Sequence, residues 1–405
     1  MRIFFALILA YILSIFYRSF LSVIATPLMA DLAIGPAELG ALSSAWFITF
    51  AVMQFPVGLA LDRVGPRLTV SVCMGVGAVG AILFAFAPTA AVATGAMALL
   101  GIGFSPVFMA ALYLFARSGP SAGFAGLASL FIGLGSLGNL LGAAPLARAA
   151  DAFGWRPTMA GVAALFCLAL LLAASLLRDP PPLPKTGNAD DRGILAGIRA
   201  IVSIRALWLL APITFTGYAI LVTTRGLWIA PFLEEVNGLD RAMQGNGAFA
   251  MALAMTAGAF VFGWVEKHLG GPKPTVLWST ALTAALFVAL ALSGHLGGLW
   301  AIVLFTAIGI AGFNYAILMA HARLFFPAHL IGRGMTTMNF LFIAGASAVQ
   351  IGSGWFIAAE RAEGLAATTT FANLHWLFAG LLLVSVLIYA RAPARAPEAP
   401  PASRA

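Results

Sequence analysis

The segment GLALDRVGPR, residues 58–67, is a short polar turn between two long apolar stretches. A degenerate copy of it, EKHLGGPK at residues 266–273, follows at an offset of 204 residues when the acidic residues are aligned. Pro27 and Asp31 match Pro231 and Glu235 at the same offset. The chain therefore contains an internal repeat of about half its length, which predicts two homologous halves.

The composition places these halves in a membrane. Apolar residues make up 61% of the 405 residues, or about 247, and charged residues only 9%. A soluble domain carries about 25% charged residues, so a water-soluble globular protein is excluded. A helix needs about 20 apolar residues to cross a bilayer, which predicts about twelve spans. The apolar runs are unbroken, unlike the alternating strands of a transmembrane barrel, so we expect an all-α integral membrane fold.

Apolar windows predict twelve spans, with the limits 3–30, 36–60, 67–88, 91–115, 122–148, 155–178, 206–232, 245–266, 275–293, 299–326, 334–358 and 371–390. One long polar stretch divides them six and six. We therefore expect an N-terminal six-helix bundle (1–178), a cytoplasmic linker (179–205) and a C-terminal six-helix bundle (206–391). The Pro- and Ala-rich residues 392–405 cannot build a core and are expected to form a disordered cytoplasmic tail.

The net charge of +8 reflects topology. With the N-terminus in the cytoplasm, the inner loops and helix ends hold sixteen basic residues and the outer loops four, namely Arg148, Arg156, Arg241 and Arg361. This positive-inside bias predicts a multi-pass protein of a bacterial-type inner (plasma) membrane with both termini in the cytoplasm. No basic stripe with interleaved aromatic residues appears, so no nucleic-acid partner is expected. Both cysteines, Cys73 and Cys167, lie in apolar runs, which does not support a disulfide framework or a Cys-ligated metal.

The loop after the second span resembles the major facilitator superfamily. The family pattern G-x-x-x-D-R-x-G-x-R is matched by Gly58, Asp62, Arg63, Gly65 and Arg67. In that family the loop is a cytoplasmic latch that favours the outward-facing state, so the resemblance implies a gating role for these residues and for Glu266 and Lys267 of the degenerate copy. It covers the chain from the first to the twelfth span and implies two pseudo-symmetric six-helix bundles that transport a solute by alternating access.

Two other patterns of the family are not met. Met97 stands where a proton-coupled relative has Arg four residues before Gly101, and Ala143 stands where the antiporter pattern of the fifth span requires Pro. These departures argue against proton-driven drug export.

The charges inside the spans indicate the substrate. All fourteen acidic residues fall in loops, in the tail or at helix ends, whereas Arg18 and Arg225 lie inside spans. A cation in the membrane is costly unless it is paired or faces a water-filled cavity. With no acidic partner in the core, the partner predicted for both arginines is an anionic substrate. Arg18 precedes Pro27 by nine residues and Arg225 precedes Pro231 by six, so their depths differ by about one helical turn.

Paired guanidinium groups suit carboxylates and phosphates. The arrangement resembles the organic-anion and organophosphate transporters of the superfamily, which carry one Arg on the first helix and one on the seventh, and the adjacent Tyr17 adds to the likeness. Other polar or aromatic residues on helices that line the pathway in this family are candidates for the same site. They are Gln54, Tyr113, Asn139, Trp228, Asn314 and Tyr315, together with Trp46 and Asn339. Helix packing is the alternative role for each, and Arg225 could instead extend to the outer interface.

The sequence thus predicts a monomeric secondary transporter, a symporter or antiporter, for a small organic anion such as a carboxylate or phosphate ester. A coupling proton or an exchange anion is a possible second ligand, and no cofactor, metal or enzymatic constellation is expected. Three alternatives stay open: a drug or metabolite exporter, a copper importer using the thioethers of Met251 and Met255, and a membrane sensor that does not transport. Substrate identity and transport direction are not determined.

Overall fold

The computed structural model describes residues 2–117, 130–179, 201, 203–293, 297–326 and 331–394, and the regular structure in these ranges is helical. The first half contains α1 (Arg2–Phe16), α2 (Leu21–Leu32), α3 (Pro36–Arg63), α4 (Pro66–Ala85), α5 (Ala90–Phe104), α6 (Val107–Arg117), α8 (Leu137–Leu141), α9 (Ala144–Phe153) and α10 (Trp155–Leu176). The second half contains α12 (Arg205–Thr223), the π-helix η1 (Thr224–Trp228), α13 (Ile229–Glu235), α14 (Arg241–His268), α15 (Pro272–Leu292), α16 (Gly298–Gly312), α17 (Tyr315–Arg323), α18 (Ile331–Ala362) and α19 (Ala367–Tyr389).

The number of spans agrees with the twelve predicted. Within the described residues, ten helices are long and apolar enough to cross a membrane, and the bent pair α1 and α2 makes eleven. The long helix α14 occupies the place of the remaining span, predicted at 245–266. The first part of the span predicted at 122–148, most of the expected linker and the expected tail from residue 395 onward lie outside the described residues.

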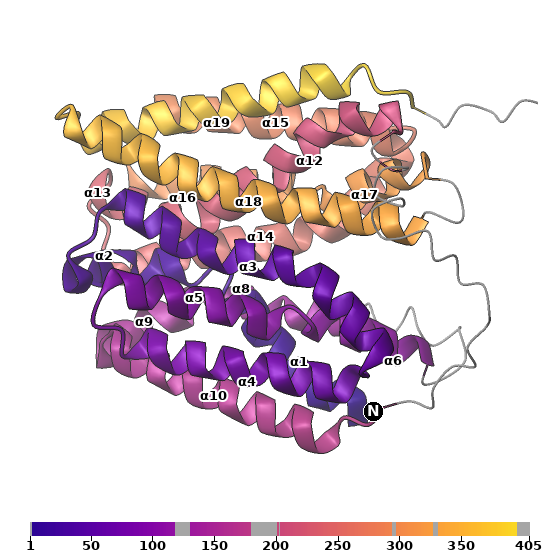
Figure 1. The fold of residues 1–405 in the computed structure, drawn as a ribbon. Helices are drawn as coiled ribbons and strands as arrows, with labels where there is room; N and C mark the ends of the chain where they lie inside the picture. The colour runs from indigo at the N-terminus through magenta and orange to yellow at the C-terminus, as the bar shows by residue number, and fades with distance from the viewer. Residues whose placement is uncertain are drawn as a thin grey trace, which may run out of the picture.

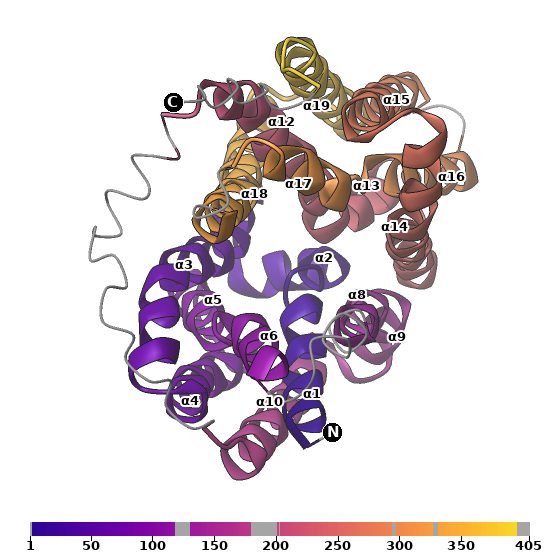
Figure 2. The same cartoon turned by 90° about the vertical axis from the view of Figure 1, so that its right-hand side faces the viewer.

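The helices form two groups that follow the order of the chain. Figure 2 shows α1–α10 gathered on one side and α12–α19 on the other. The halves meet along α3 and α18, and again where α14 packs against α8 and α9. We call the end of the molecule at which α1 begins and α3 ends the inner end, and the opposite end the outer end (Figure 1).

Helices at equivalent places in the two halves are interrupted. The first span breaks between α1 and α2, and its counterpart, the seventh, contains the π-helix η1. The fourth span breaks at Ser105 and Pro106, and its counterpart, the tenth, breaks at Phe313 and Asn314. Pro106 accounts for one break, since proline lacks the N–H donor that would continue the helical hydrogen bonds. Irregular backbone at membrane depth is tolerated only where protein or a water-filled cavity surrounds it, so these interruptions mark the interior of the helical bundle.

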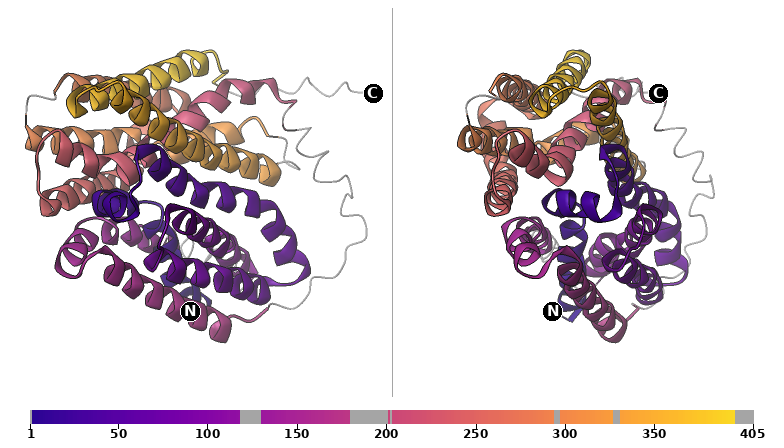
Figure 3. Two further views of the ribbon diagram at one scale, coloured as in Figure 1. Left: turned by 60° about the vertical axis from the view of Figure 1, so that its left-hand side comes forward. Right: turned by 90° about the vertical axis from the view of Figure 1, so that its left-hand side faces the viewer.

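The first span differs from the expectation of a continuous helix over 3–30, because it consists of two helices, α1 and α2. The two parts of this span are bent by 60°. The N–H groups of Arg18 and Ser19 bond to carbonyls only three residues back, at 3.3 and 3.0 Å, which tightens the chain into turns. The bend allows α2 to lie against η1 and α13 of the second half, where the halves meet (Figure 3).

Tryptophans mark the surface of the second half. Each of its six spans carries one exposed Trp, whereas Trp46 and Trp155 of the first half are buried. The exposed residues lie toward the inner end on α12, α14 and α15 and toward the outer end on α16, α18 and α19: Trp208, Trp264, Trp278, Trp300, Trp355 and Trp376. Two such levels are typical of the aromatic belts of membrane proteins.

Glycines bring the backbones of the halves into contact near the outer end. A Cβ added at Gly354 of α18 would lie 2.6 Å from the carbonyl oxygen of Pro36, and one at Gly40 of α3 would lie 2.5 Å from that of Gln350. Small residues permit such close helix packing in membranes. The close packing of α3 against α18 therefore requires glycine, which has no side chain, at these two positions.

The variant Gly354→Ala should weaken this junction. Its new methyl group meets backbone that cannot move aside, and overpacking of this kind costs about 1–3 kcal/mol. Gly352→Ala on the same helix is the matched control, because its Cβ would meet nothing within 4 Å. We expect Gly354→Ala to lower the melting temperature of the purified protein and Gly352→Ala to leave it unchanged or raise it. Equal melting temperatures would show that the junction is not tightly packed.

Candidate functional site

Arg18 lies in the break between α1 and α2 and turns toward two rings of α3. The carbon at the centre of its guanidinium group is 5.0 Å from the ring centroid of Trp46 and 5.0 Å from that of Phe50. The two rings are stacked on one another, with centroids 4.9 Å apart. Cation–π attraction therefore holds the guanidinium group from one side.

Arg225 lies in η1 and is buried, with 4% of its surface exposed. Its backbone touches the break that carries Arg18. The hydroxyl of Ser22 donates to the carbonyl oxygen of Arg225 at 3.0 Å, and a Cβ at Gly226 would lie 2.9 Å from the carbonyl oxygen of Arg18. The two guanidinium charges are close enough to repel each other. The structure thus brings the two predicted arginines to one place between the halves.

Neither guanidinium group has an acidic partner in the part of the chain that the structure describes. The ion pairs found there join Arg156 to Asp31, Arg241 to Asp151 and Arg361 to Glu235, all at the outer end. The Nε donors of both site arginines are buried without an acceptor.

Two further donors beside the arginines also have no acceptor. They are the indole Nε1 of Trp46, which lies against Arg18, and the hydroxyl of Thr223, which precedes η1. Buried donors are nearly always satisfied in folded proteins. A cluster of unsatisfied donors is suited to receive a group rich in acceptors.

Three tyrosines accompany the arginines. Tyr315 follows the break between α16 and α17, and its ring centroid is 5.8 Å from that of Tyr218 on α12. Its hydroxyl donates to Oδ1 of Asn339 on α18 at 3.2 Å. The third, Tyr11, lies on α1 of the first half. Of the residues predicted for the site, Arg18 contacts Trp46 and the backbone beside Arg225, and Tyr315 contacts Asn339.

The sequence analysis missed Tyr11 and Tyr218, although the internal repeat contains a signal for them. Tyr11 precedes Arg18 by seven residues and Tyr218 precedes Arg225 by seven, so both pairs repeat at the same offset of 207. Seven residues are nearly two turns of a regular helix, although α1 ends at Phe16 and α12 at Thr223, before the arginines.

Three other candidate residues contact their own half. Tyr17 is buried among Phe16, Phe20 and Phe104, with ring centroids 5.1–5.6 Å apart. The indole of Trp228 donates to Ser353 Oγ at 2.8 Å within the second half. Asn314 donates to Ser279 Oγ at 2.7 Å and to Thr280 Oγ1 at 2.9 Å, which ties the break in the tenth span to α15.

The remaining candidates are only partly buried. Gln54 donates from Nε2 to the carbonyl oxygens of Phe50, at 3.1 Å, and Ser105, at 3.4 Å, and so satisfies a carbonyl at the break in the fourth span. Tyr113 packs against the hydrophobic core from α6, and Asn139 is half-buried on α8.

Met251 and Met255, the candidates for copper binding, are buried in the hydrophobic core. The carbonyl of Met251 would lie 2.7 Å from a Cβ added at Gly309, so this part of α14 packs closely against α16.

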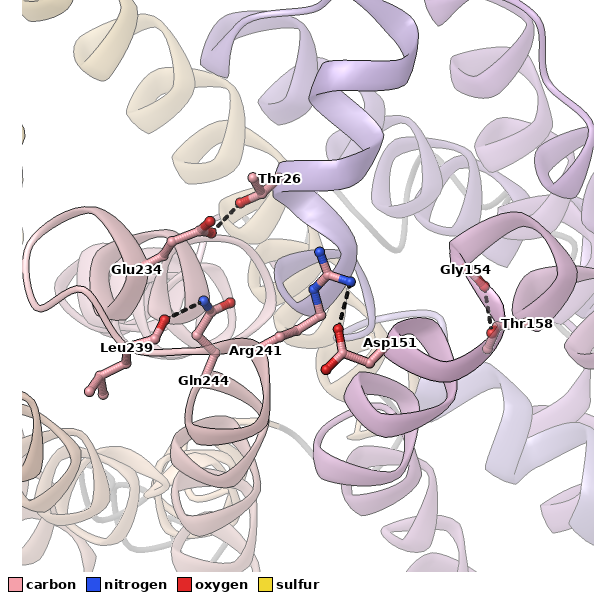
Figure 4. A network of polar contacts seen from close by, with 8 residues as sticks. All are labelled: Thr26, Asp151, Gly154, Thr158, Glu234, Leu239, Arg241 and Gln244. Carbon is pink, nitrogen blue, oxygen red and sulfur yellow. Dashed lines mark hydrogen bonds and ion pairs between the residues drawn. The ribbon is translucent and has the colours of Figure 1, made fainter.

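Polar contacts join the halves at the outer end (Figure 4). The hydroxyl of Thr26 on α2 donates to Oε2 of Glu234 on α13. Arg241 at the start of α14 pairs with Asp151 at the end of α9, at 2.9 Å. This ion pair is partly exposed, so we expect it to contribute at most about 1 kcal/mol. Together with the glycine contacts, these bonds close the outer end.

The predicted gating loop contacts the end of its own bundle. Gly65 has a φ of +96°, which favours glycine, and a Cβ there would lie 2.7 Å from Oδ1 of Asp179. The same oxygen accepts from the backbone N–H of Arg67 at 2.8 Å, and Arg67 Nε donates to the carbonyl of Ala174 at 3.3 Å. Asp179 thus supplies an acceptor to the first turn of α4, where a helix has unsatisfied N–H donors.

The other gating candidates make fewer contacts. The side chain of Asp62 lies outside the described residues, Arg63 is exposed, and a Cβ at Gly58 would meet nothing within 4 Å. In the second copy of the loop, Glu266 is half-buried and Lys267 is exposed.

Comparison with known proteins agrees with this architecture. A family model described as Major Facilitator Superfamily matches residues 7–349. A bacterial homologue of the human lysosomal transporter Spinster, in an inward-facing and occupied conformation, superposes with a TM-score of 0.77 at 18% identity and covers 98% of both chains. A D-xylose-proton symporter reaches a TM-score of 0.75 at 14% identity, again over 98% of both chains. The nucleoside transporter NupG reaches 0.77 at 15% identity, over 96% of this chain and 99% of that one.

A curated relative is more similar in sequence. The uncharacterized transporter YybO of Bacillus subtilis (strain 168) is 24% identical over 276 residues. The alignment covers 64% of this chain and 62% of that protein, which is less than two thirds of its length.

The unpaired charge of Arg225 should lower the stability of the protein without ligand. We expect Arg225→Met to raise the melting temperature of the purified protein, because replacing buried charges by apolar groups of similar volume stabilises by about 1–4 kcal/mol in favourable cases. Arg156→Met is the control. It removes bonds to Asp31 and to the carbonyl of Ala87, at 3.3 and 2.9 Å, and should lower the melting temperature slightly. A drop for Arg225→Met would indicate that this arginine is a structural group.

Proposed function

The chain belongs to the Major Facilitator Superfamily, and we propose that it is a secondary active transporter of a small organic anion, a carboxylate or a phosphate ester. Arg18 and Arg225 bind the acidic group. The single observation that carries this proposal is the pair of arginines between the halves, of which Arg225 is buried and Arg18 is partly buried, each with a buried Nε donor that lacks an acceptor. Stability alone gives no reason to place two repelling cations there.

The chemistry of the site selects an anion over a cation or a neutral solute. Arginine presents planar donor sets that match the oxygens of a carboxylate or phosphate. The indole N–H of Trp46 and the hydroxyl of Thr223 are further donors without an acceptor, which a ligand rich in acceptor oxygens could bond. No ion pair with a carboxylate occupies either arginine among the described residues, so an anionic substrate supplies the missing charge.

The position of the site suits alternating access. One arginine comes from each half, and transporters built from two repeats bind substrate at the interface of the repeats. The contacts at the outer end hold the two halves together on that side of the site. A state open to the outer side would require these contacts to break. We place the inner end in the cytoplasm of a bacterial-type inner membrane, as the distribution of basic residues predicts.

Loss of either arginine should weaken anion binding. Candidate carboxylates and phosphate esters are first screened for those that raise the melting temperature of purified protein, since ligands of the folded state stabilise it. For such an anion, Arg18→Gln and Arg225→Gln should each reduce affinity about tenfold to a hundredfold, as expected for a charge-assisted bond worth about 1.5–3 kcal/mol. Arg156→Gln, which changes a paired arginine at the outer end, should bind normally. Unchanged affinity in both site variants would refute the proposed role.

The loop between α3 and α4 should affect turnover rather than binding. We propose that Asp62 takes part in the cytoplasmic latch, as the family resemblance implies. Asp62→Asn should therefore slow uptake into proteoliposomes and leave affinity for the same anion unchanged. Glu363→Gln, at an exposed position at the outer end, is the control. A transport rate for Asp62→Asn equal to that of the control would contradict the latch role.

A further inference from the structure

We infer that the site takes an elongated amphipathic anion, whose acidic group binds Arg18 and Arg225 and whose aromatic body lies against Tyr11, Tyr218 and Tyr315. This inference rests on the proposed anion transport and adds the shape and chemistry of the substrate. We call the arginine pair the arginine tier and the three tyrosines the tyrosine tier.

The two tiers follow from spacing along the helices. Tyr11 lies seven residues before Arg18, and Tyr218 lies seven before Arg225. Seven residues correspond to about 10 Å along a helix, and each arginine lies just beyond the end of the α-helix that carries its tyrosine, Arg18 in the break after α1 and Arg225 in η1. In both halves the tyrosine lies on the inner side of its arginine. The tyrosine tier is therefore about two turns nearer the inner end than the arginine tier.

Ring contacts hold the tyrosine tier together in the second half. Tyr218 and Tyr315 lie with centroids 5.8 Å apart, and Phe342 of α18 contacts both, at 5.7 and 4.3 Å. Tyr218 and Tyr315 are only partly buried. Phe342 thus supports both tyrosine rings on one side, and each ring keeps some exposed surface that a ligand can contact.

The first half contributes Tyr11, whose ring is stacked between Phe108 and Phe131 with centroids 5.3 and 4.7 Å apart and is 8% exposed. Both faces of this ring are covered within the first half, so Tyr11 offers a ligand only its edge, whereas Tyr218 and Tyr315 keep more of their surface.

The chemistry of the tiers differs, and a compact anion would use only one of them. The arginine tier offers charge and N–H donors. The tyrosine tier offers ring faces and edges that pack on an aromatic group, with hydroxyls at their ends. A substrate that contacts both tiers needs an acidic group and a planar apolar body separated by a linker of a few bonds.

The test compares two carboxylates, acetate and 4-phenylbutyrate, by equilibrium binding to the purified full-length protein in lipid nanodiscs. If both tiers take part, 4-phenylbutyrate should bind about tenfold more tightly or better, since burial of a phenyl group adds about this much affinity. Binding of both probes should weaken in Arg18→Gln and Arg225→Gln.

Variants of the tyrosine tier should separate the probes. Tyr218→Leu should remove most of the advantage of 4-phenylbutyrate and leave acetate binding unchanged. Tyr218→Phe keeps the ring and should retain most of the advantage, which keeps the test valid if the leucine variant does not fold. Phe153→Leu, which removes an aromatic ring 73% exposed at the outer end, should not change the ratio of the two affinities.

The outcomes distinguish this inference from the proposed function. Equal affinity for the two probes, both dependent on the arginines, would overturn the tyrosine tier and leave anion transport supported. An advantage of 4-phenylbutyrate that persists in Tyr218→Leu would also overturn it. Binding of neither probe, or binding that depends on neither arginine, would count against both proposals.

Discussion

The centre of this protein holds two guanidinium groups without an acidic partner among the described residues. The free-energy cost of placing them between the helices is the constraint on which the surrounding structure depends. A cation in the membrane interior is expensive unless a partner or water receives it, and the mutual repulsion of Arg18 and Arg225 adds to that cost. The rings of Trp46 and Phe50 offset part of it for Arg18. The irregular backbone at both arginines is compatible with a membrane only because it lies between the two halves.

The same segments connect the site to the closure of the outer end. Arg225 presents its side chain to the site, and its carbonyl accepts from Ser22 of the other half at 3.0 Å. One helical turn further out on the same helix, the hydroxyl of Thr26 of α2 donates to Glu234 of α13. A displacement of η1 therefore changes the arginine tier and the outer junction together. If the outer end opens and closes in this way, a ligand shifts the balance between the open and closed states only by the difference in its affinity for the two.

The sequence predicted the architecture and the arginine pair, because span length and the cost of buried charge are nearly independent of context. It did not predict the break at Tyr17–Phe20, which contains neither Pro nor Gly and lies against Gly226 of the other half. Side-chain direction was also missed. The side chain of Tyr17 contacts Phe20 and Phe104 of its own half, although Tyr17 is adjacent to Arg18 in the sequence. Trp228 and Asn314 satisfy their donors within their own half, which only tertiary structure reveals.

Under the proposed alternating access, the repeat gives a physical reason why one site could serve both sides of the membrane. Each half supplies one arginine and one tyrosine at the same spacing, so a substrate held across the interface contacts equivalent groups from both halves. Rocking about the site then changes the contacts at the ends of the molecule more than those with the substrate. Tyr315 corresponds to Phe108 at the same offset of 207, and each packs on the tyrosine of its own half, with centroids 5.8 and 5.3 Å apart. The two halves differ here by the hydroxyl of Tyr315, which is bonded to Asn339 of α18.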